Sequence, residues 1–143
     1  MRLTATFVHT GARVLATTAA LALGAAHCAW AQPDAAAVAR GQAIASSRSQ
    51  GLCVLCHALP GQAEAFQGTL APPLDGVGAR LSAAQLRERL LAPERFNPDT
   101  VMPAYGRTEG LQRVAPALRG RPLLQPQQID DLVAWLQTLQ NPP

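Results

Sequence analysis

The chain has 143 residues, which is room for one domain. Hydrophobic residues make up 48% of it and charged residues 15%, so the composition predicts a packed core and argues against disorder. The formal charge is +3, and no apolar run reaches the length of a membrane-spanning helix.

The first 31 residues are organised as a secretory signal peptide. Arg2 and Arg13 supply a positively charged start, and an apolar run follows at residues 14–26. A membrane anchor is the alternative, but this run is too short to span a bilayer comfortably. The small residues of the AWA segment predict cleavage after Ala31. We therefore expect a periplasmic protein that begins at Gln32.

Cleavage changes the chemistry that the remaining chain can support. Removing 31 of 143 residues leaves one domain of 112 residues, 32–143. Two of the 12 basic residues and none of the 9 acidic ones are lost, so the formal charge becomes 10 − 9 = +1. A nearly neutral exported chain gives no electrostatic case for nucleic-acid binding. The remaining cysteines are Cys53 and Cys56, the one histidine is His57, and the one methionine is Met102.

The first predicted helix begins near Asp34, an acidic cap, and covers residues 35–47. Gly41 lies within it, and we expect this glycine to let the last helix approach closely through Leu132 or Trp135. The alternative is a glycine that the helix merely tolerates at a cost of about 1 kcal/mol. The segment that follows, up to residue 52, reads as helix end and loop.

The segment GLCVLCHALP, residues 51–60, carries the chemistry. Cys53, Cys56 and His57 occupy positions i, i+3 and i+4, which share one face of a helical turn. The pattern C-x-x-C-H is the attachment motif of c-type haem. Two thioethers can hold one edge of the porphyrin while the imidazole reaches the iron. The motif therefore favours one covalently attached haem c.

Two other chemistries use such a cluster. A zinc site needs four nitrogen or sulfur ligands, or three and a water, and no further cysteine or histidine remains after cleavage. A redox-active C-x-x-C should follow a strand in a βαβ pattern, which the preceding segment does not resemble. Both alternatives are disfavoured relative to haem.

The next segments alternate loop and helix. Residues 69–80 are rich in proline and glycine and are expected to form a loop. Ser82 and Gln85 have the spacing of a capping box, and Pro93 ends the helix that they begin. The charged triplet at residues 87–89 is most simply the solvated face of that helix.

Met102 lies in a segment where Pro98 and Pro103 prevent a regular helix. It stands 45 residues after His57 and has no second histidine or lysine as a competitor. A core-filling methionine is the alternative. We expect Met102 to be presented from a loop as the sixth ligand of the iron.

The last predicted helix opens with Pro126 at a first-turn position. Its apolar residues recur on one face: Ile129, Leu132, Val133, Leu136 and Leu139. No segment alternates as a strand does. The sequence therefore predicts an all-α domain wrapped around a large apolar cofactor.

These residues resemble a class I cytochrome c over nearly the whole chain after the signal. The resemblance rests on C-x-x-C-H, then PPLDG, then a Met-Pro loop, then DLVAWL. It implies that the carbonyl of Pro72 accepts a hydrogen bond from the axial His57, which fixes the ring and raises its basicity. It also implies that Arg80 lies beside a haem propionate; a plain surface arginine is the alternative.

A narrower resemblance covers the second half. The segments NPDTVMPAY at 97–105, RV at 113–114 and GRPLLQPQQIDDLVAWLQTL at 120–139 are similar to the SoxX family. SoxX proteins are the monohaem partners of SoxA in bacterial thiosulfate oxidation. One departure is Leu52, where a polar residue is expected before the first cysteine.

The resemblance implies a complex that joins thiosulfate to a cysteine of the carrier SoxYZ, with bond-making on the SoxA-type subunit. Both thiols of this chain are taken by thioethers, and a haem closed by histidine and methionine has no open position. His/Met ligation raises the reduction potential, which suits an electron acceptor. We therefore expect the chain to accept electrons and pass them to a soluble cytochrome c. A free electron shuttle is the alternative, and a ligand-binding sensor would require Met102 to leave the iron.

Overall fold

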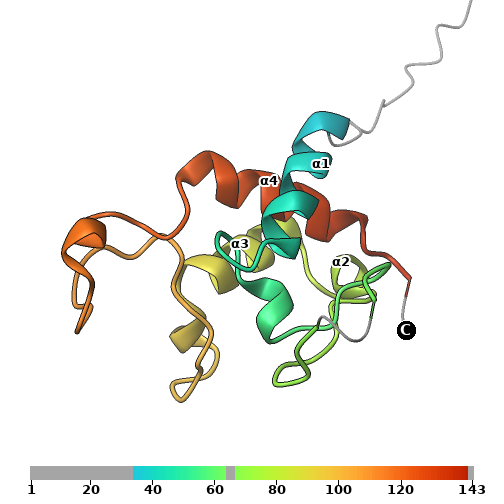
Figure 1. The fold of residues 1–143 in the computed structure, drawn as a ribbon. Coiled ribbons are helices and arrows are strands. Elements are labelled where there is room, and N and C mark those ends of the chain that lie inside the picture. The colour runs from blue at the N-terminus through green and yellow to red at the C-terminus, as the bar shows by residue number, and fades with distance from the viewer. Residues whose placement is uncertain (1–33, 64–66, 142–143) are drawn as a thin grey trace, which may run out of the picture. The chain divides into compact units, whose positions relative to one another are not determined.

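A computed structural model describes residues 34–63 and 67–141. The predicted signal peptide and its cleavage site after Ala31 lie outside these residues. In chain order the elements are α1 (Ala35–Ser46), η1 (Cys53–Leu55), α2 (Val77–Arg80), α3 (Ala83–Leu91), η3 (Pro93–Arg95), η4 (Pro116–Leu118) and α4 (Pro126–Thr138) (Figure 1). The described residues contain no strand, so the expected all-α class is confirmed. None of their helices has the length and apolarity needed to cross a membrane.

Helix α1 begins where the acidic cap predicts. The Asp34 side chain accepts a hydrogen bond from the backbone N–H of Ala36 at 3.0 Å. This bond satisfies one of the donors that the first turn of a helix leaves without a partner. The helix ends at Ser46, and a turn leads to the C-x-x-C-H motif, as expected.

Helices α1 and α4 pack closely against each other at Gly41. A Cβ atom at this position would lie 2.8 Å from the Cβ of Trp135 and closer still to the carbonyl of Asp131. The expected role of Gly41 is therefore confirmed, with Trp135 rather than Leu132 as the side chain at the contact. The Arg40 guanidinium adds two hydrogen bonds of 2.8 Å to the buried Asp131 carboxylate.

Helix α3 has the predicted capping box. The Gln85 side chain accepts from the backbone N–H of Ser82 at 2.9 Å, and the Ser82 hydroxyl accepts from that of Gln85 at 3.3 Å. The helix ends at Leu91, two residues before Pro93, which begins η3 instead of continuing α3.

The expectation of a loop throughout residues 69–80 is wrong at its end, where α2 makes one helical turn. Gly76 introduces this turn with a φ of 65°, a left-handed conformation that glycine adopts without strain. A Cβ on Gly78 would lie 2.6 Å from the carbonyl oxygen of Leu136, so the turn packs directly on the end of α4. Tertiary packing therefore gives helical structure to a segment whose composition is that of a loop.

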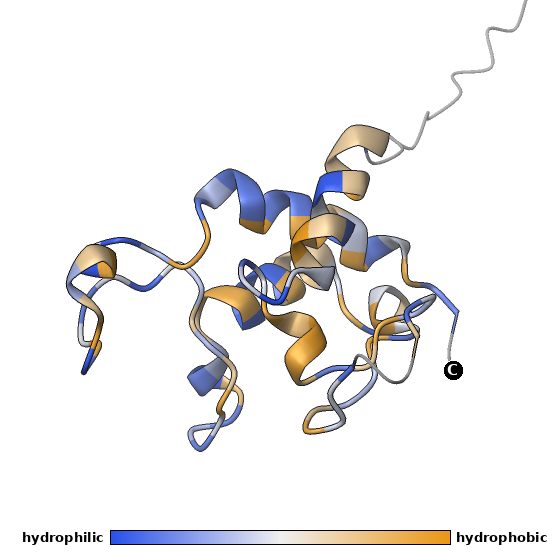
Figure 2. Cartoon of the chain, in the orientation of Figure 1, coloured by the Kyte–Doolittle hydropathy of each residue, from blue (hydrophilic) through white to orange (hydrophobic). Residues whose placement is uncertain are grey.

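Helix α4 supplies much of the core. Ile129, Leu132 and Leu136 are buried, and Val133 packs against them. Leu139, the last apolar residue of the predicted face, is the C-cap residue beyond the helix. Figure 2 shows hydrophobic colouring on η1 and hydrophilic colouring on η3 and the first turns of α4. Apolar residues of η1 and α4, among them Leu55, Leu132 and Trp135, line the cavity that contains the candidate site.

Candidate functional site

A cavity of about 810 Å³ lies among η1, the loop at residues 70–74, α2, α3, the loop at 97–105 and α4. Most of the side chains that line it are apolar, including Val77, Leu86, Leu90 and Trp135. Its size falls within the range of small-molecule and cofactor sites. The structure brings all of the predicted site residues to this one cavity: Cys53, Cys56, His57, Pro72, Arg80 and Met102.

The two cysteines and the histidine lie on one tight turn. Residues 53–55 form a 3-10 helix rather than a full α-helical turn. The Cys53 carbonyl accepts from the N–H of Cys56 at 3.1 Å and from that of His57 at 2.8 Å. These bonds keep the i, i+3 and i+4 side chains on the same side of the turn, and all three line the cavity.

His57 is oriented by the backbone of the loop opposite. Its Nδ1 lies 2.6 Å from the carbonyl oxygen of Pro72. A carbonyl can only accept, so Nδ1 carries the proton and donates. The lone pair of the neutral ring is therefore on Nε2, which is free to bind a metal ion.

Met102 reaches the same cavity from a loop held by its own polar residues. The Asn97 side chain accepts from the N–H of Asp99 at 3.1 Å, and the Thr100 hydroxyl accepts from that of Met102 at 3.1 Å. No residue from 97 to 104 is helical, as the two prolines predict. Met102 is half-buried and packs against the hydrophobic core.

Arg80 lies at the end of α2 and lines the cavity. Its Nη1 donates to the carbonyl of Asp75 at 2.8 Å, and the residue is exposed. The remaining donors of its guanidinium are available to an anionic group in the cavity.

Tyr105 also lines this cavity, although the sequence did not predict a role for it. Its buried hydroxyl donates to the carbonyl of Gly51 at 2.6 Å and lies 3.9 Å from the sulfur of Cys53. Burial raises the pKa of Tyr105, so the hydroxyl stays protonated and able to donate. The sequence holds one signal for this residue, since it is the only tyrosine. The hydrogen bond from Tyr105 to Gly51 could not be predicted from the sequence, because the two residues are 54 positions apart.

The prediction that Arg89 belongs to the solvated face of α3 is wrong. Arg89 lines the cavity and its Nε is buried. The other two members of the charged triplet fit the prediction, since Arg87 pairs with Asp130 and Glu88 pairs with Arg95. The Arg89 guanidinium stacks on the ring of Phe96, with its carbon 4.1 Å from the ring centroid.

The two alternative chemistries find no support in this geometry. Burial raises the pKa of the Cys53 thiol, whereas a redox-active C-x-x-C thiol has a lowered pKa. The motif follows a helix and a turn rather than a strand. Within residues 34–63 and 67–141, no group of three or more His, Cys, Asp or Glu side chains could hold a metal ion such as zinc.

A covalently bound haem fits the cavity chemically. The apolar walls match a porphyrin face, and the two thiols lie beside a histidine with its lone pair on Nε2. The buried Nε of Arg89 has no hydrogen-bond partner among the described residues, so an anionic group of the cofactor could satisfy it.

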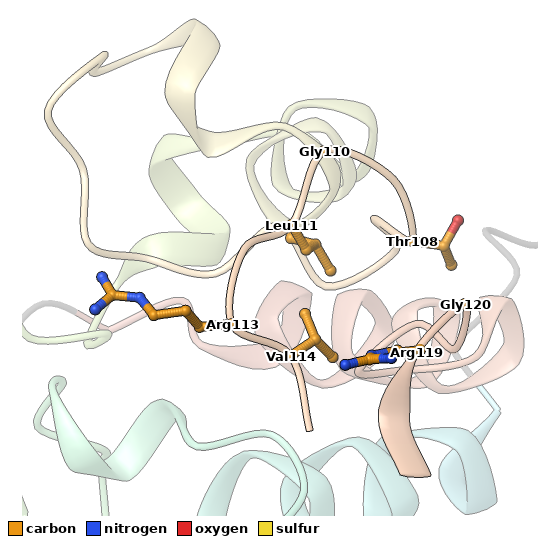
Figure 3. A pocket seen from close by; sticks show the side chains of 7 residues that line it. All are labelled: Thr108, Gly110, Leu111, Arg113, Val114, Arg119 and Gly120. Carbon is orange, nitrogen blue, oxygen red and sulfur yellow. The ribbon is translucent and has the colours of Figure 1, made fainter. Parts of the chain in front are cut away.

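A second cavity, of about 330 Å³, lies within the segment after Met102. Figure 3 shows the side chains of Leu111 and Val114 pointing toward each other, while Arg113 points away. The segment at residues 106–121 is exposed throughout except for the half-buried Val114. This cavity holds no titratable group apart from arginines, and we assign it no chemistry.

The family model of cytochrome c matches residues 38–140. The chain belongs to the cytochrome c family, whose members carry covalently bound haem c and transfer electrons. Cys53 and Cys56 lie in the haem-binding region of the match.

Among solved structures, the chain is similar to one in the crystal structure of SoxXA from P. pantotrophus. The two are 37% identical, with a TM-score of 0.65, and the match covers 72% of this chain and 81% of that one. This similarity confirms the expected resemblance to SoxX. No curated protein matches the chain significantly.

Proposed function

We propose that this chain holds one haem c through thioethers of Cys53 and Cys56, with His57 and Met102 as the axial ligands. The convergence of these four side chains on one cavity supports this assignment. The hydrogen bond from His57 to Pro72 would fix the imidazole plane and make the ring a stronger ligand. When bound, the haem supplies reversible one-electron transfer, and His/Met ligation sets a high potential.

We further propose that the chain is the electron-accepting subunit of a periplasmic SoxAX-like complex. The observation that carries this proposal is the 37% identity to a chain of SoxXA over most of both chains. In such a complex, thiosulfate and a carrier cysteine thiol would form one S–S bond and release one proton and two electrons. This chain would take those electrons one at a time from a SoxA-type partner and pass them to a soluble cytochrome c.

The cysteine count supports a division of labour in an L-cysteine S-thiosulfotransferase-type complex. After cleavage the chain has two cysteines, and both would be thioethers. No thiol of this chain would remain to join thiosulfate to the carrier, a SoxYZ-type protein. The bond-making site is therefore assigned to the SoxA-type partner, and electron transfer to this chain.

The surface supports a stable partner more than a free shuttle. Leu111, Leu118 and Leu123 are 47%, 51% and 47% exposed, and they come from one projecting segment, orange in Figure 1. Large apolar side chains exposed on one segment suggest an interaction surface when they form a contiguous patch. A stable interface is more apolar than the surface of a transient one. We assign this leucine-bearing segment, residues 106–123, to contact with the SoxA-type partner.

Purification of the exported protein from its native source tests the proposal. We expect a larger haem-containing subunit to co-purify with it. The mature chain should have the mass of residues 32–143 plus one haem, which checks the cleavage site and the number of haems together. Isolation of the chain as a monohaem protein without a partner would instead favour a free electron-shuttling cytochrome c.

Reconstitution tests the division of labour. Thiosulfate turnover with oxidised cytochrome c should require both subunits and the carrier. With an artificial oxidant in place of this chain, the SoxA-type partner should still load the carrier. Loading of the carrier by this chain alone would refute the assignment.

A further inference from the structure

Arg89 lines the cavity and forms no ion pair with any described residue. Its Nε is buried and has no hydrogen-bond partner among the described residues. Asp99 also lines the cavity, yet no ion pair joins the two. An unpaired buried donor destabilises the folded state, and more so when it belongs to a charged group. A group that the cavity binds is therefore the natural source of the missing acceptor.

Phe96 determines how Arg89 can bind that group. The guanidinium carbon lies 4.1 Å from the ring centroid, so the ring covers one face of the guanidinium. The N–H donors of a guanidinium lie in its plane, so they can form two parallel hydrogen bonds to a carboxylate, a bidentate pair. Stacking on Phe96 thus leaves the edge of Arg89 available to a carboxylate and limits its freedom to turn elsewhere.

We propose that Arg89 binds a propionate carboxylate of the haem. This inference rests on the proposed haem site, because the propionates are the anionic groups of that cofactor. It adds a second arginine to Arg80, which lies on α2 and already donates to the backbone of Asp75. Arg89 acts as a positioning residue: it touches the cofactor periphery and not the reacting iron.

The pairing has two electrostatic consequences. A cation near the haem stabilises the reduced state, which carries one positive charge less on the iron. It also keeps the propionate ionised, because a carboxylate beside an arginine has a lowered pKa. The potential of the wild-type protein should therefore change little between pH 5 and pH 8. Without Arg89, a buried propionate would titrate in that interval and make the potential depend on pH.

The test is a spectroelectrochemical titration of the haem-loaded wild type, Arg89→Gln and Arg87→Gln from pH 5 to pH 8. Arg87 is the matched control, since it lies on the same helix and pairs with Asp130. At pH 8, Arg89→Gln should reduce the one-electron equilibrium constant at least threefold, about 30 mV at 59 mV per tenfold change. Its potential should rise toward that of the wild type as the pH falls. Arg87→Gln should follow the wild type throughout.

Arg89→Lys provides a second test in case the Arg89→Gln variant does not bind haem. Lysine keeps the positive charge but cannot form the bidentate pair. The variant should therefore have a potential close to that of the wild type and a flat pH profile. Equal potentials and pH profiles in Arg89→Gln and in Arg87→Gln, with haem present in both, would overturn the proposal. So would an Arg89→Lys protein that binds haem but has a potential well below that of Arg87→Gln and dependent on pH, because a retained charge should preserve both properties. A wild-type protein without covalent haem in its pyridine haemochrome spectrum would instead overturn the haem site itself.

Discussion

The hydroxyl of Tyr105 donates a 2.6 Å hydrogen bond to the carbonyl of Gly51, joining segments 54 residues apart. Tyr105 comes three residues after Met102, and Gly51 comes two residues before Cys53. The bond therefore ties the loop that presents the methionine to the turn that presents the cysteines. Met102 is the proposed sixth ligand, and a ligand must stay at a fixed distance from the iron, so this bond is suited to hold Met102 in place.

Tyr105→Phe should loosen that connection. The variant keeps the buried ring and leaves the Gly51 carbonyl without its donor, which should lower the free energy of unfolding by about 1–3 kcal/mol. Because the methionine loop is the freed element, the near-infrared sulfur-to-iron band should disappear at a lower denaturant concentration than in the wild type. Chemical denaturation followed at that band and by far-ultraviolet circular dichroism checks both effects. Unchanged midpoints at both wavelengths would show that the bond does not hold the loop.

Met102→Ala tests the sixth ligand directly. The oxidised wild type should show the weak near-infrared band of methionine ligation, and the variant should lack it. The potential should fall, because His/Met ligation favours the reduced iron. Val101→Ala is the control, since Val101 is the neighbouring residue and is 75% exposed. A band that persists in Met102→Ala would mean that another side chain is the ligand.

The sequence predicted the parts of this site that depend on local spacing. The C-x-x-C-H motif, the lone Met102 between two prolines and the caps at Asp34 and Ser82 all follow rules that act within a few residues. They could be recognised without a fold.

The parts that sequence analysis missed depend on packing between distant segments. The one-turn helix α2 forms because Gly78 packs against the end of α4. Arg89 lines the cavity, and its guanidinium stacks on Phe96, seven residues later. The hydrogen bond from Tyr105 to the Gly51 carbonyl forms only when the fold brings their two segments together. Neither periodicity nor composition encodes these contacts.

Gly41→Ala should destabilise the protein strongly. The added methyl would lie 2.8 Å from the Cβ of Trp135 and closer to the backbone of Asp131, so α1 and α4 would have to separate. Overpacking of this kind typically costs about 1–3 kcal/mol, more than the roughly 1 kcal/mol that alanine gains over glycine in a helix. Gln42→Ala, at the exposed next position, should change stability by less than about 0.5 kcal/mol. Thermal unfolding of the two haem-loaded variants gives the comparison, and equal melting temperatures would contradict the close approach.

The pair of Arg40 and Asp131 should make stability depend on pH in a defined direction. Hydrogen bonds from Arg40, and then from Gln127, lower the pKa of the Asp131 carboxyl despite its burial. A lowered pKa means that the folded state holds the ionised form more tightly than the unfolded state does. The stabilisation is therefore complete above the ordinary aspartate pKa of about 4, and it is lost as the pH falls through the lowered value. Asp131→Asn should be less stable than the wild type at pH 7, and the difference should shrink below about pH 4.

The opposite substitution, Arg40→Gln, should behave differently. The Arg40 side chain is 51% exposed and that of Asp131 only 3%, so removing the aspartate leaves a cation that water can solvate. Removing the arginine leaves a buried carboxylate with the Gln127 amide as its remaining side-chain donor. Arg40→Gln should therefore be the less stable variant at pH 7. Its stability should approach that of the wild type on acidification, because protonation of Asp131 removes the unpaired buried charge. Urea denaturation of the three proteins at pH 3, 5 and 7 measures this ordering. The same loss for both variants at every pH would mean that the pair contributes through packing and not through charge.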